Sequence, residues 1–273
     1  MVEARAALID AAARFSFSAT PRLDAELLLA HALGIPRERL LLSLDDHPVP
    51  SSFADLVARR AGHEPVAYIT ARRGFWTLDL TVGPGALVPR ADSETLIEAA
   101  LAHFADRPPA TVLDLGAGPG TLLLALLSEW PQARGLGVDR SAAALAYART
   151  NAAPFTGRAA FVQGDWATAV EGVFDLVVCN PPYVATREPL PREVAEYEPA
   201  AALYAGPQGL DDYRRLAPEL ARLVASGGAA VLEIGSTQAK AVTALLEAQK
   251  FSVEERHDLG GRPRALVGTP SAS

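Results

Sequence analysis

Hydrophobic residues recur at helical spacing through residues 1–72, and four short helices are expected there, at about 2–13, 21–33, 36–42 and 52–61. Thr20 followed by Pro21 is typical of a helix start, and Gly34 is typical of a helix end. Residues 1–72 are therefore predicted to form a small helical bundle.

From residue 62 onward the apolar positions move closer together. Residues 66–69 and, more clearly, residues 75–82 alternate polar with apolar side chains in the manner of β-strands. Residues 73–90 are accordingly predicted to form a β-hairpin or linker. Asp92 or Ser93 is expected to cap a helix that runs to about Phe104.

In residues 91–273, short apolar runs alternate with amphipathic stretches. Strands are expected at 111–115, 135–138, 159–162, 174–179 and 229–234, with two closing strands at 251–255 and 265–268 and a loose tail from Pro270. The intervening helices are expected at 121–129, 141–153 and 210–225, and at 236–249 with Ser236 as its cap; the glycines at 227 and 228 are expected to turn the chain. This alternation is typical of an α/β fold with a mostly parallel sheet. Right-handed crossovers place strand 174–179 beside strand 111–115, so that a ligand site forms where both strands end.

A glycine-rich loop follows the first of these strands. Its residues are Gly116, Ala117, Gly118, Pro119 and Gly120, and an apolar helix begins directly after them. Glycines let the backbone approach a nucleoside cofactor closely, although the G-x-G-x-G spacing matches neither a dinucleotide fingerprint nor a P-loop.

Three further residues follow the next two strands. Asp139 ends the second strand about 20 residues beyond the glycines, where a carboxylate accepts ribose hydroxyls. Asp165 could accept an adenine amino group and Trp166 could cover the ring; alternatively, Asp165 caps a helix and Trp166 is part of the core.

The strand at 174–179 ends in Asn180, Pro181, Pro182 and Tyr183. Two prolines fix φ twice and remove two N–H donors, so the backbone presents only carbonyl acceptors. Asn180 adds a side-chain carbonyl, and Tyr183 adds a flat ring against which a planar group can lie. The pattern favours a substrate with a planar NH₂ group, and the alternative is a proline-rich turn with a capping Asn.

Charge and composition narrow the classes of partner. The net charge is −7 and the pI is about 5.3, which argues against a polyanion as main substrate. Residues 1–72 carry eight Arg and nine Asp or Glu, a balance that suits docking a protein. The five histidines lack metal-ligand spacing, and Cys179 is alone in an apolar strand, so neither a metal site nor a disulfide is expected. Without a membrane-length apolar run or a signal-peptide pattern, a cytoplasmic protein with no membrane contact is expected.

Taken together, residues 114–120 with Asp139 resemble the S-adenosylmethionine site of class I methyltransferases, and residues 180–183 resemble their motif for methylating a planar amino group. Further segments resemble the release-factor glutamine methyltransferases of the HemK/PrmC family, over about residues 20–268; these segments are 64–69, 88–94, 198–203, 209–214 and 232–235. Pro119, Thr70 and Ala91 depart from the usual residues of that family, where Ser, Gly and Pro are common.

The resemblance implies a helical N-terminal domain that recognises the release factor, a seven-stranded catalytic domain, and methylation of the glutamine in the Gly-Gly-Gln loop of release factors. It implies S-adenosyl-L-methionine as cofactor, bound by residues 116–120, Asp139, Asp165, Trp166 and Asn180. Residues 180–183 would be catalytic and, with Arg90 and Glu94, would contact the substrate, although Arg90 and Glu94 could simply pair with each other. A monomer without direct nucleic-acid contact is expected.

Three alternatives remain open at this point. One is a glutamine methyltransferase that acts on a ribosomal protein. Another is a methyltransferase that acts on the amino group of adenine N6 or guanine N2 after base flipping, which would need a basic surface. A cofactor-binding adaptor without catalysis is the third.

Overall fold

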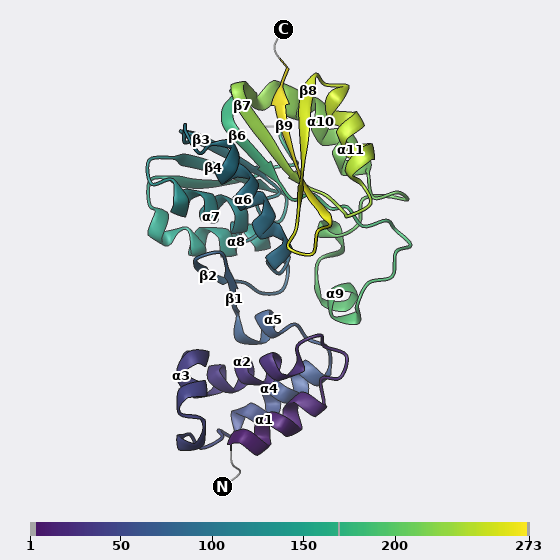
Figure 1. Ribbon diagram of the computed structural model, residues 1–273. Helices are drawn as coiled ribbons and strands as arrows, with labels where there is room; N and C mark the ends of the chain where they lie inside the picture. The colour runs from purple at the N-terminus through teal and green to yellow at the C-terminus, as the bar shows by residue number, and fades with distance from the viewer. Residues whose placement is uncertain (1–3, 169, 272–273) are drawn as a thin grey trace. The chain divides into compact units, whose positions relative to one another are not determined.

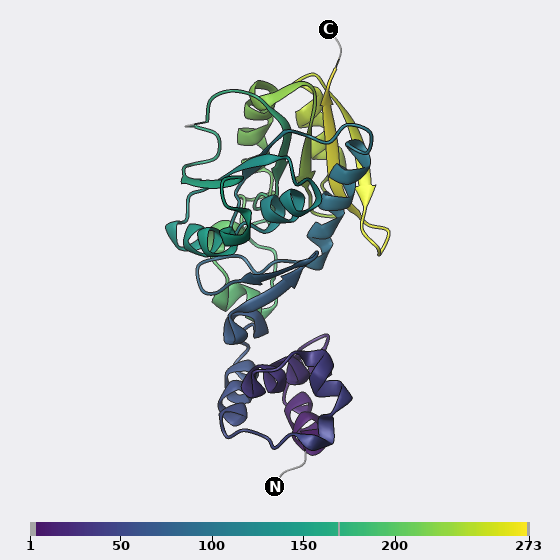
Figure 2. The same ribbon diagram turned by 90° about the vertical axis from the view of Figure 1, so that its left-hand side faces the viewer.

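The computed structural model describes residues 4–168 and 170–271 (Figures 1 and 2). The chain divides into two compact units. One consists of the chain up to Arg72 together with Leu190–Tyr197, and the other consists of Arg73–Pro189 together with the chain from Glu198 onward. None of the helices in the described residues is both long enough and apolar enough to cross a membrane.

The N-terminal unit is helical, as its apolar spacing predicts. It contains α1 (Ala4–Ala13), α2 (Pro21–Leu33), α3 (Arg37–Leu42), η1 (Leu44–Asp46), α4 (Ser52–Ala61) and α5 (Val66–Thr70). Their apolar faces form one core, which includes Leu8, Phe15, Leu28, Leu29, Leu40 and Phe53. Gly34 ends α2 in the left-handed conformation, with φ of 66°. Residue 2, where the first helix was expected to begin, lies outside the described residues.

The alternation seen at residues 66–69 was wrong as a sign of a strand, because these residues form the helix α5. The backbone N–H groups of Tyr68 and Ile69 donate to the carbonyl of Pro65, at 2.9 and 3.1 Å. Ala67, Tyr68 and Ile69 are all buried. Successive residues of a strand point to opposite faces, so a half-buried strand would expose at least one of these three side chains.

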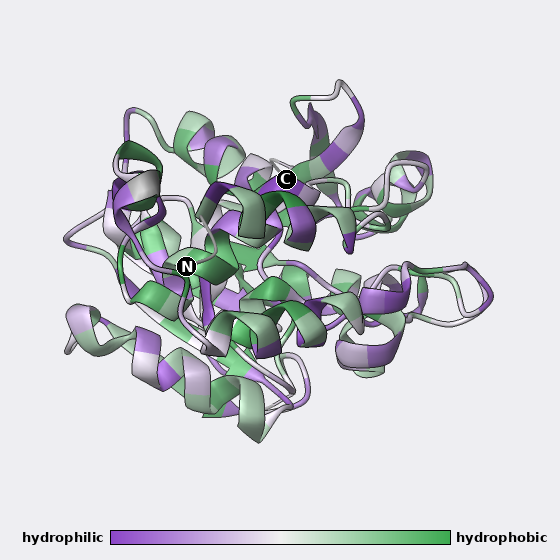
Figure 3. Ribbon diagram, turned by 90° about the horizontal axis from the view of Figure 1, so that it is seen from below, coloured by the Kyte–Doolittle hydropathy of each residue, from purple (hydrophilic) through white to green (hydrophobic). Residues whose placement is uncertain are grey.

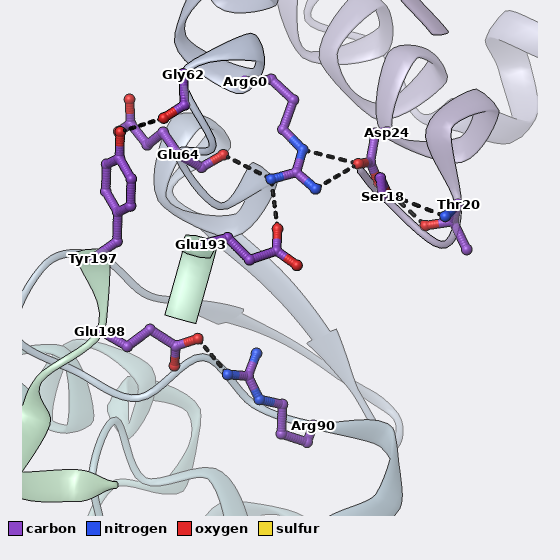
Figure 4. Close-up of polar contacts among 10 residues, drawn as sticks. All are labelled: Ser18, Thr20, Asp24, Arg60, Gly62, Glu64, Arg90, Glu193, Tyr197 and Glu198. Atoms are coloured by element: carbon purple, nitrogen blue, oxygen red, sulfur yellow. Dashed lines mark hydrogen bonds and ion pairs between the residues drawn. The ribbon is translucent and has the colours of Figure 1, made fainter. Parts of the chain in front are cut away.

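One helix of the N-terminal unit comes from far along the chain. It is α9 (Arg192–Tyr197), which buries none of its side chains and is held by polar contacts. The buried guanidinium of Arg60 donates to Asp24 at 2.9 Å, and its Nη1 donates to Glu193 of α9 at 2.6 Å (Figure 4). The hydroxyl of Tyr197 donates to the carbonyl of Gly62 at 2.9 Å. These bonds hold residues 190–197 on the helical bundle.

The second unit opens with the hairpin of β1 (Arg72–Phe75) and β2 (Leu78–Thr81). The hairpin prediction is confirmed, but the single strand expected at 75–82 was wrong, because Trp76 turns the chain with φ of 54°. A large sheet follows, built from β3 (Thr111–Leu115), β4 (Arg134–Asp139), β5 (Ala159–Gln163), β6 (Phe174–Cys179), β7 (Val224–Glu233), β8 (Phe251–His257) and β9 (Pro263–Pro270).

The strand order of this sheet is β5-β4-β3-β6-β7-β9-β8. Pairs among β3 to β7 are parallel, and β9 runs antiparallel to both β7 and β8. The seven-stranded α/β prediction is confirmed, including the placement of β6 beside β3. The carboxyl ends of β3, β4 and β6 therefore meet at one edge, where Leu115 lies opposite both Val138 and Cys179.

Helices cover both faces of the sheet (Figures 1 and 2). They are α6 (Glu94–His103), α7 (Thr121–Glu129), α8 (Ala142–Asn151), α10 (Asp211–Leu223) and α11 (Ala239–Glu247), with short turns η2 (Ala91–Ser93), η3 (Ala153–Phe155) and η4 (Ala200–Ala202). Leu113, Leu115, Val177 and Cys179 belong to one core with α10 and α11, while α6 and α7 contact each other and the sheet. Figure 3 shows hydrophobic and hydrophilic segments alternating along the helices, as amphipathic helices require.

Several local predictions were wrong near the end of the chain. Gly227 and Gly228 lie inside β7, beside an irregular pairing with β6, rather than ahead of it. The helix α11 is preceded by Gln238, so Ser236 does not cap it. Pro270 ends β9, and Ser271 donates its N–H to the carbonyl of Lys250 at 2.8 Å, so neither belongs to a loose tail; residues 272–273 lie outside the described residues.

Candidate active site

The glycine-rich loop turns tightly at the end of β3. Gly116, Gly118 and Gly120 have φ of 79°, 56° and 86°, a region that other residues rarely adopt. The N–H groups of Gly116 and Ala117 both donate to the carbonyl of Val138, at 2.8 and 2.9 Å. The loop is thereby fixed to the end of β4, and it leads directly into α7.

Asp139, at the end of β4, is held by two backbone donors. One carboxylate oxygen accepts the N–H of Gly118 at 2.8 Å, and the other accepts the N–H of Ser141 at 2.7 Å. Ser141 in turn caps α8, as predicted, by accepting the N–H of Ala144 at 3.1 Å. Each carboxylate oxygen has more than one lone pair, so Asp139 is oriented and still able to accept bonds from a ligand.

Two adjoining clefts open at this edge of the sheet. The larger encloses about 760 Å³, and its lining includes Gly85, Asp139, Asp165, Trp166 and Asp212. The smaller encloses about 420 Å³, and its lining includes Val88, Arg90, Ser93, Asp114 and Thr121. Leu87, Gly116, Gly118 and Asn180 line both.

Trp166 and Asp165 lie on one wall of the larger cleft. The indole N–H of Trp166 donates to Asp212 at 3.1 Å, and its ring lies so close to Gly116 that a Cβ there would be 3.1 Å from it. Trp166 also packs against the core of the sheet. It is therefore both part of the cleft lining and a neighbour of the core. Asp165 is exposed and pairs with Arg215 at 2.6 Å; residues 166–168 form turns, so the alternative that Asp165 caps a helix was wrong.

Asn180 lies at the junction of the two clefts, at the end of β6. Its side-chain Nδ2 donates to the hydroxyl of Ser93 at 3.2 Å. Pro181 and Pro182, the next two residues, are buried, and Pro182 also lines the larger cleft. The carbonyl of Tyr183 accepts a bond from the Gln238 side chain at 2.9 Å, which fixes the far end of the motif.

Behind this motif lies a buried carboxylate, Glu233, at the end of β7. Its two oxygens accept bonds from the hydroxyls of Ser93 and Tyr183, the latter at 3.1 Å. Burial raises the pKa of Glu233 above its ordinary range, against the effect of these bonds and of Arg264. Burial and the nearby Glu233 likewise raise the pKa of Tyr183, so this phenol stays protonated. Ser93 was expected as a helix cap, but its hydroxyl makes no cap bond.

Asp114 is a second buried carboxylate, and it is one of the residues that line the smaller cleft. Oδ2 accepts the N–H of Leu123 at 3.1 Å, whereas Oδ1 has no hydrogen-bond partner in the described residues. Burial, and to a lesser extent the charge of Asp139, raises the pKa of Asp114 to about 7. A buried carboxylate with an unpaired oxygen favours a cationic ligand group.

Arg90 and Glu94 do not pair with each other. Arg90 binds the buried Glu198, whose other oxygen accepts the N–H of Val88 at 3.0 Å (Figure 4). Glu94 accepts the backbone N–H of Trp76 at 2.9 Å and is not among the lining residues of either cleft. The structure therefore brings Arg90 to the site, while Glu94 fixes the hairpin.

Sequence reasoning gave no role in the site to Ser93, Glu198 or Glu233, and it included Asp114 only as the first residue of the 114–120 motif. Two of them carried a recognisable signal, because Asp114 and Glu233 are single carboxylates inside apolar strand sequences. A charged residue in a buried strand is rare unless it is paired or functional.

Comparison with known proteins identifies the family of this chain. Residues 6–70 match the family model of the PrmC N-terminal domain, and residues 92–196 match that of the methyltransferase small domain. A release factor glutamine methyltransferase of Caulobacter vibrioides is 42% identical over 258 residues, which cover 91% of this chain and 89% of that protein. The chain belongs to the release factor glutamine methyltransferase family.

Other relatives extend the match. A release factor glutamine methyltransferase of Cereibacter sphaeroides is 43% identical over 96% of this chain and 92% of its own length. A methyltransferase structure from Pyrococcus furiosus has a TM-score of 0.56 at 16% identity, covering 80% of this chain and 100% of that one, which shows the shared fold. Membership of the family confirms the resemblance that the sequence predicted.

Proposed function

We propose that this protein methylates the side-chain amide of the glutamine in the Gly-Gly-Gln loop of peptide-chain release factors, with S-adenosyl-L-methionine as methyl donor. Relatives named for this reaction cover most of the chain at 42–43% identity, which supports the substrate class. The observation that carries the proposal is the position of Asn180, which lines both clefts and precedes two prolines without N–H groups.

The residues around the larger cleft fit S-adenosylmethionine. When bound, this cofactor supplies a methyl group on a sulfonium, which is electrophilic. Asp139 is oriented to accept ribose hydroxyls, and Trp166 and Asp165 would contact the adenine. Asp114 fits the α-ammonium group, because this residue lines the adjoining smaller cleft and its buried Oδ1 has no donor among the described residues.

The chemistry that residues 180–183 must perform is orientation of a weak nucleophile. The nitrogen of an amide is poorly nucleophilic because its lone pair is delocalised into the carbonyl. The side-chain oxygen of Asn180 and the carbonyl of Pro181 would each accept one N–H of the substrate, which fixes the direction of the nitrogen. Such positioning can lower a barrier by roughly 7–11 kcal/mol.

The remaining polar groups have supporting roles. Tyr183 packs its ring beside the substrate amide while its hydroxyl is held by Glu233. Arg90 lines the smaller cleft next to Asn180 and would contact the substrate loop. No strong general base lies in the 180–183 sequence, so the substrate proton would leave to a carbonyl or to water after the new bond forms. The helical unit, with its near-balanced charge, would bind the body of the release factor.

A labelling experiment tests the proposal. The protein is incubated with methyl-labelled S-adenosylmethionine and, separately, a purified release factor, the same factor with Gln→Ala in its Gly-Gly-Gln loop, ribosomes, tRNA and DNA. Label on the intact factor alone, located by mass spectrometry on the glutamine side chain, is expected. Label on ribosomal protein or nucleic acid, with none on the release factor, would overturn the proposal in favour of the corresponding alternative.

A further inference from the structure

We propose that Ser93 and Glu233 are positioning residues that hold the Asn180 amide with its oxygen toward the substrate; this inference rests on the proposed function. The three residues come from separate segments. Asn180 follows β6, Ser93 precedes α6, and Glu233 ends β7. Two neighbouring strands and the start of a helix therefore bring these three side chains together.

The amide of an asparagine side chain is nearly symmetric in shape but not in its hydrogen bonding. An asparagine side chain can turn by half a rotation and exchange its oxygen with its NH₂ group at almost no change in shape. Only its hydrogen-bond partners distinguish the two orientations. In the reversed orientation Asn180 would present donors to a substrate NH₂, which is itself a donor, and the substrate would not be held.

The hydroxyl of Ser93 decides between these orientations. It carries one proton, and the carboxylate of Glu233, an acceptor only when ionised, takes that proton in a hydrogen bond. The Ser93 oxygen can then only accept from Asn180, which fits the observed Nδ2 contact of 3.2 Å. Both Ser93 and Glu233 are buried, at 3% and 1% exposure, so solvent does not supply a competing donor.

The same carboxylate also anchors the other end of the motif. Its second oxygen accepts the hydroxyl of Tyr183 at 3.1 Å, and its backbone carbonyl accepts the hydroxyl of Tyr213 at 2.8 Å. Glu233 therefore fixes Tyr183 directly and Asn180 through Ser93. One buried anion sets the direction of both side chains that flank the two prolines.

Steady-state kinetics and a double-mutant cycle test the inference with the full-length protein. Ser93→Ala should lower kcat at least about tenfold, while the Kd of S-adenosylmethionine, measured by calorimetry, stays within about twofold. Ser93→Thr keeps the hydroxyl and should restore most of the activity. Thr95→Val, which removes another buried hydroxyl from α6, is the matched control and should leave kcat unchanged.

The double-mutant cycle shows whether Ser93 acts on catalysis through Asn180 or only stabilises the surrounding structure. In an Asn180→Ala background, Ser93→Ala should cost nothing further in single-turnover rate, because the group on which Ser93 acts is gone. Glu233→Leu, which offers the Ser93 hydroxyl no acceptor, should lower kcat in the same way as Ser93→Ala. An equal loss from Ser93→Ala in both backgrounds, or no loss in either, would refute the inference.

A measurement that needs no turnover keeps this test independent of the substrate. The side-chain NH₂ resonances of Asn180, assigned by their absence in Asn180→Ala, should show one hydrogen-bonded proton that is lost in Ser93→Ala. If wild type fails to label release factor, the proposed function fails, yet this resonance still reports whether Ser93 holds the amide. Unchanged Asn180 resonances in Ser93→Ala would overturn the positioning role whatever the substrate is.

Discussion

The hydroxyl of Ser93 donates to the carboxylate of Glu233, a residue 140 positions later in the chain. This one bond joins the start of α6 to the end of β7, directly behind the residues that follow β6. Because Glu233 also accepts from Tyr183, the edge of the sheet carries a buried polar network under the 180–183 motif. Buried networks of this kind rigidify a site when each member is satisfied.

Asn180→Ala is expected to reduce turnover far more than cofactor binding. The substitution removes one acceptor that we assign to the transition state, and loss of a comparable hydrogen-bonding group typically costs about 10²–10³-fold in kcat. The Asn180 side chain makes its contact with Ser93 rather than with the glycine-rich loop, so the Kd for S-adenosylmethionine should change little. Single-turnover rates and calorimetry would measure the two effects, and parallel losses of equal size would contradict the assigned role.

Asp114→Asn is expected to stabilise the ligand-free protein above neutral pH. The folded state raises the pKa of Asp114 from 3.8 to about 7, so it binds this proton more tightly than the unfolded chain does. Stability from this group is therefore fully present below pH 3.8 and is lost as pH rises toward 7, by about 4 kcal/mol in total. An Asn side chain carries no charge at any pH, so the variant does not lose this stability as pH rises.

Thermal unfolding between pH 4 and 8 would measure this effect. The melting temperature of Asp114→Asn should exceed that of the wild type at pH 8, and the difference should shrink toward pH 4. Calorimetry should show weaker binding of S-adenosylmethionine, by about tenfold or more, because a charge-assisted bond to its ammonium is lost. A variant that is less stable than wild type at pH 8 would argue against an uncompensated charge at this position.

Local sequence patterns were sufficient to predict the sheet and the edge that carries the site. The helix expected at 121–129 begins and ends at those residues, and the crossover rule placed β6 beside β3. That placement alone brought Asp139 and Asn180 to one cleft. These features follow from side-chain period and chain handedness, which a sequence displays directly.

The remaining features depend on partners distant in sequence. The helix α9 was missed because it buries no side chain and so has no apolar stripe; its contacts with the helical unit are polar. Ser93 stands where a cap belongs, and only the folded protein reveals that its hydroxyl turns to Glu233 instead. No local pattern distinguishes these two uses of a serine.

Arg60→Ala is expected to destabilise the helical unit by about 3–5 kcal/mol, because it leaves the charge of Asp24 buried without a cation. The side chains of Arg60 and Asp24 are only 4% and 9% exposed, and Nη1 of Arg60 also binds Glu193 (Figure 4). Arg59→Ala is the control, since its pair with Glu64 is largely exposed on the arginine side and should contribute less than about 1 kcal/mol.

Urea unfolding of both variants would measure the difference, and limited proteolysis would follow residues 190–197. Cleavage in this segment should accelerate in Arg60→Ala and change much less in Arg59→Ala, because in the described residues Arg60 hydrogen-bonds Glu193 of α9 whereas Arg59 hydrogen-bonds Glu64. Similar stability of the two variants would show that the buried pair contributes no more than the exposed one.

Gly209→Ala is expected to lower kcat at least tenfold, through Tyr183. Gly209 has φ of 69°, and a Cβ there would lie 2.1 Å from the carbonyl oxygen of Tyr183 and 2.8 Å from the amide of Gln238 that binds it. Backbone atoms at these distances must move, and a displacement of about 1 Å near reacting groups can cost 10²-fold in rate. Gly157→Ala is the matched control, because its φ of 77° imposes the same backbone strain while nothing lies within 4 Å of the added Cβ. Gly157→Ala should lose about 1–2 kcal/mol of stability from that strain, and Gly209→Ala should lose more because backbone atoms must also move. Equal activity in both variants would mean that the carbonyl of Tyr183 can shift without disturbing the site.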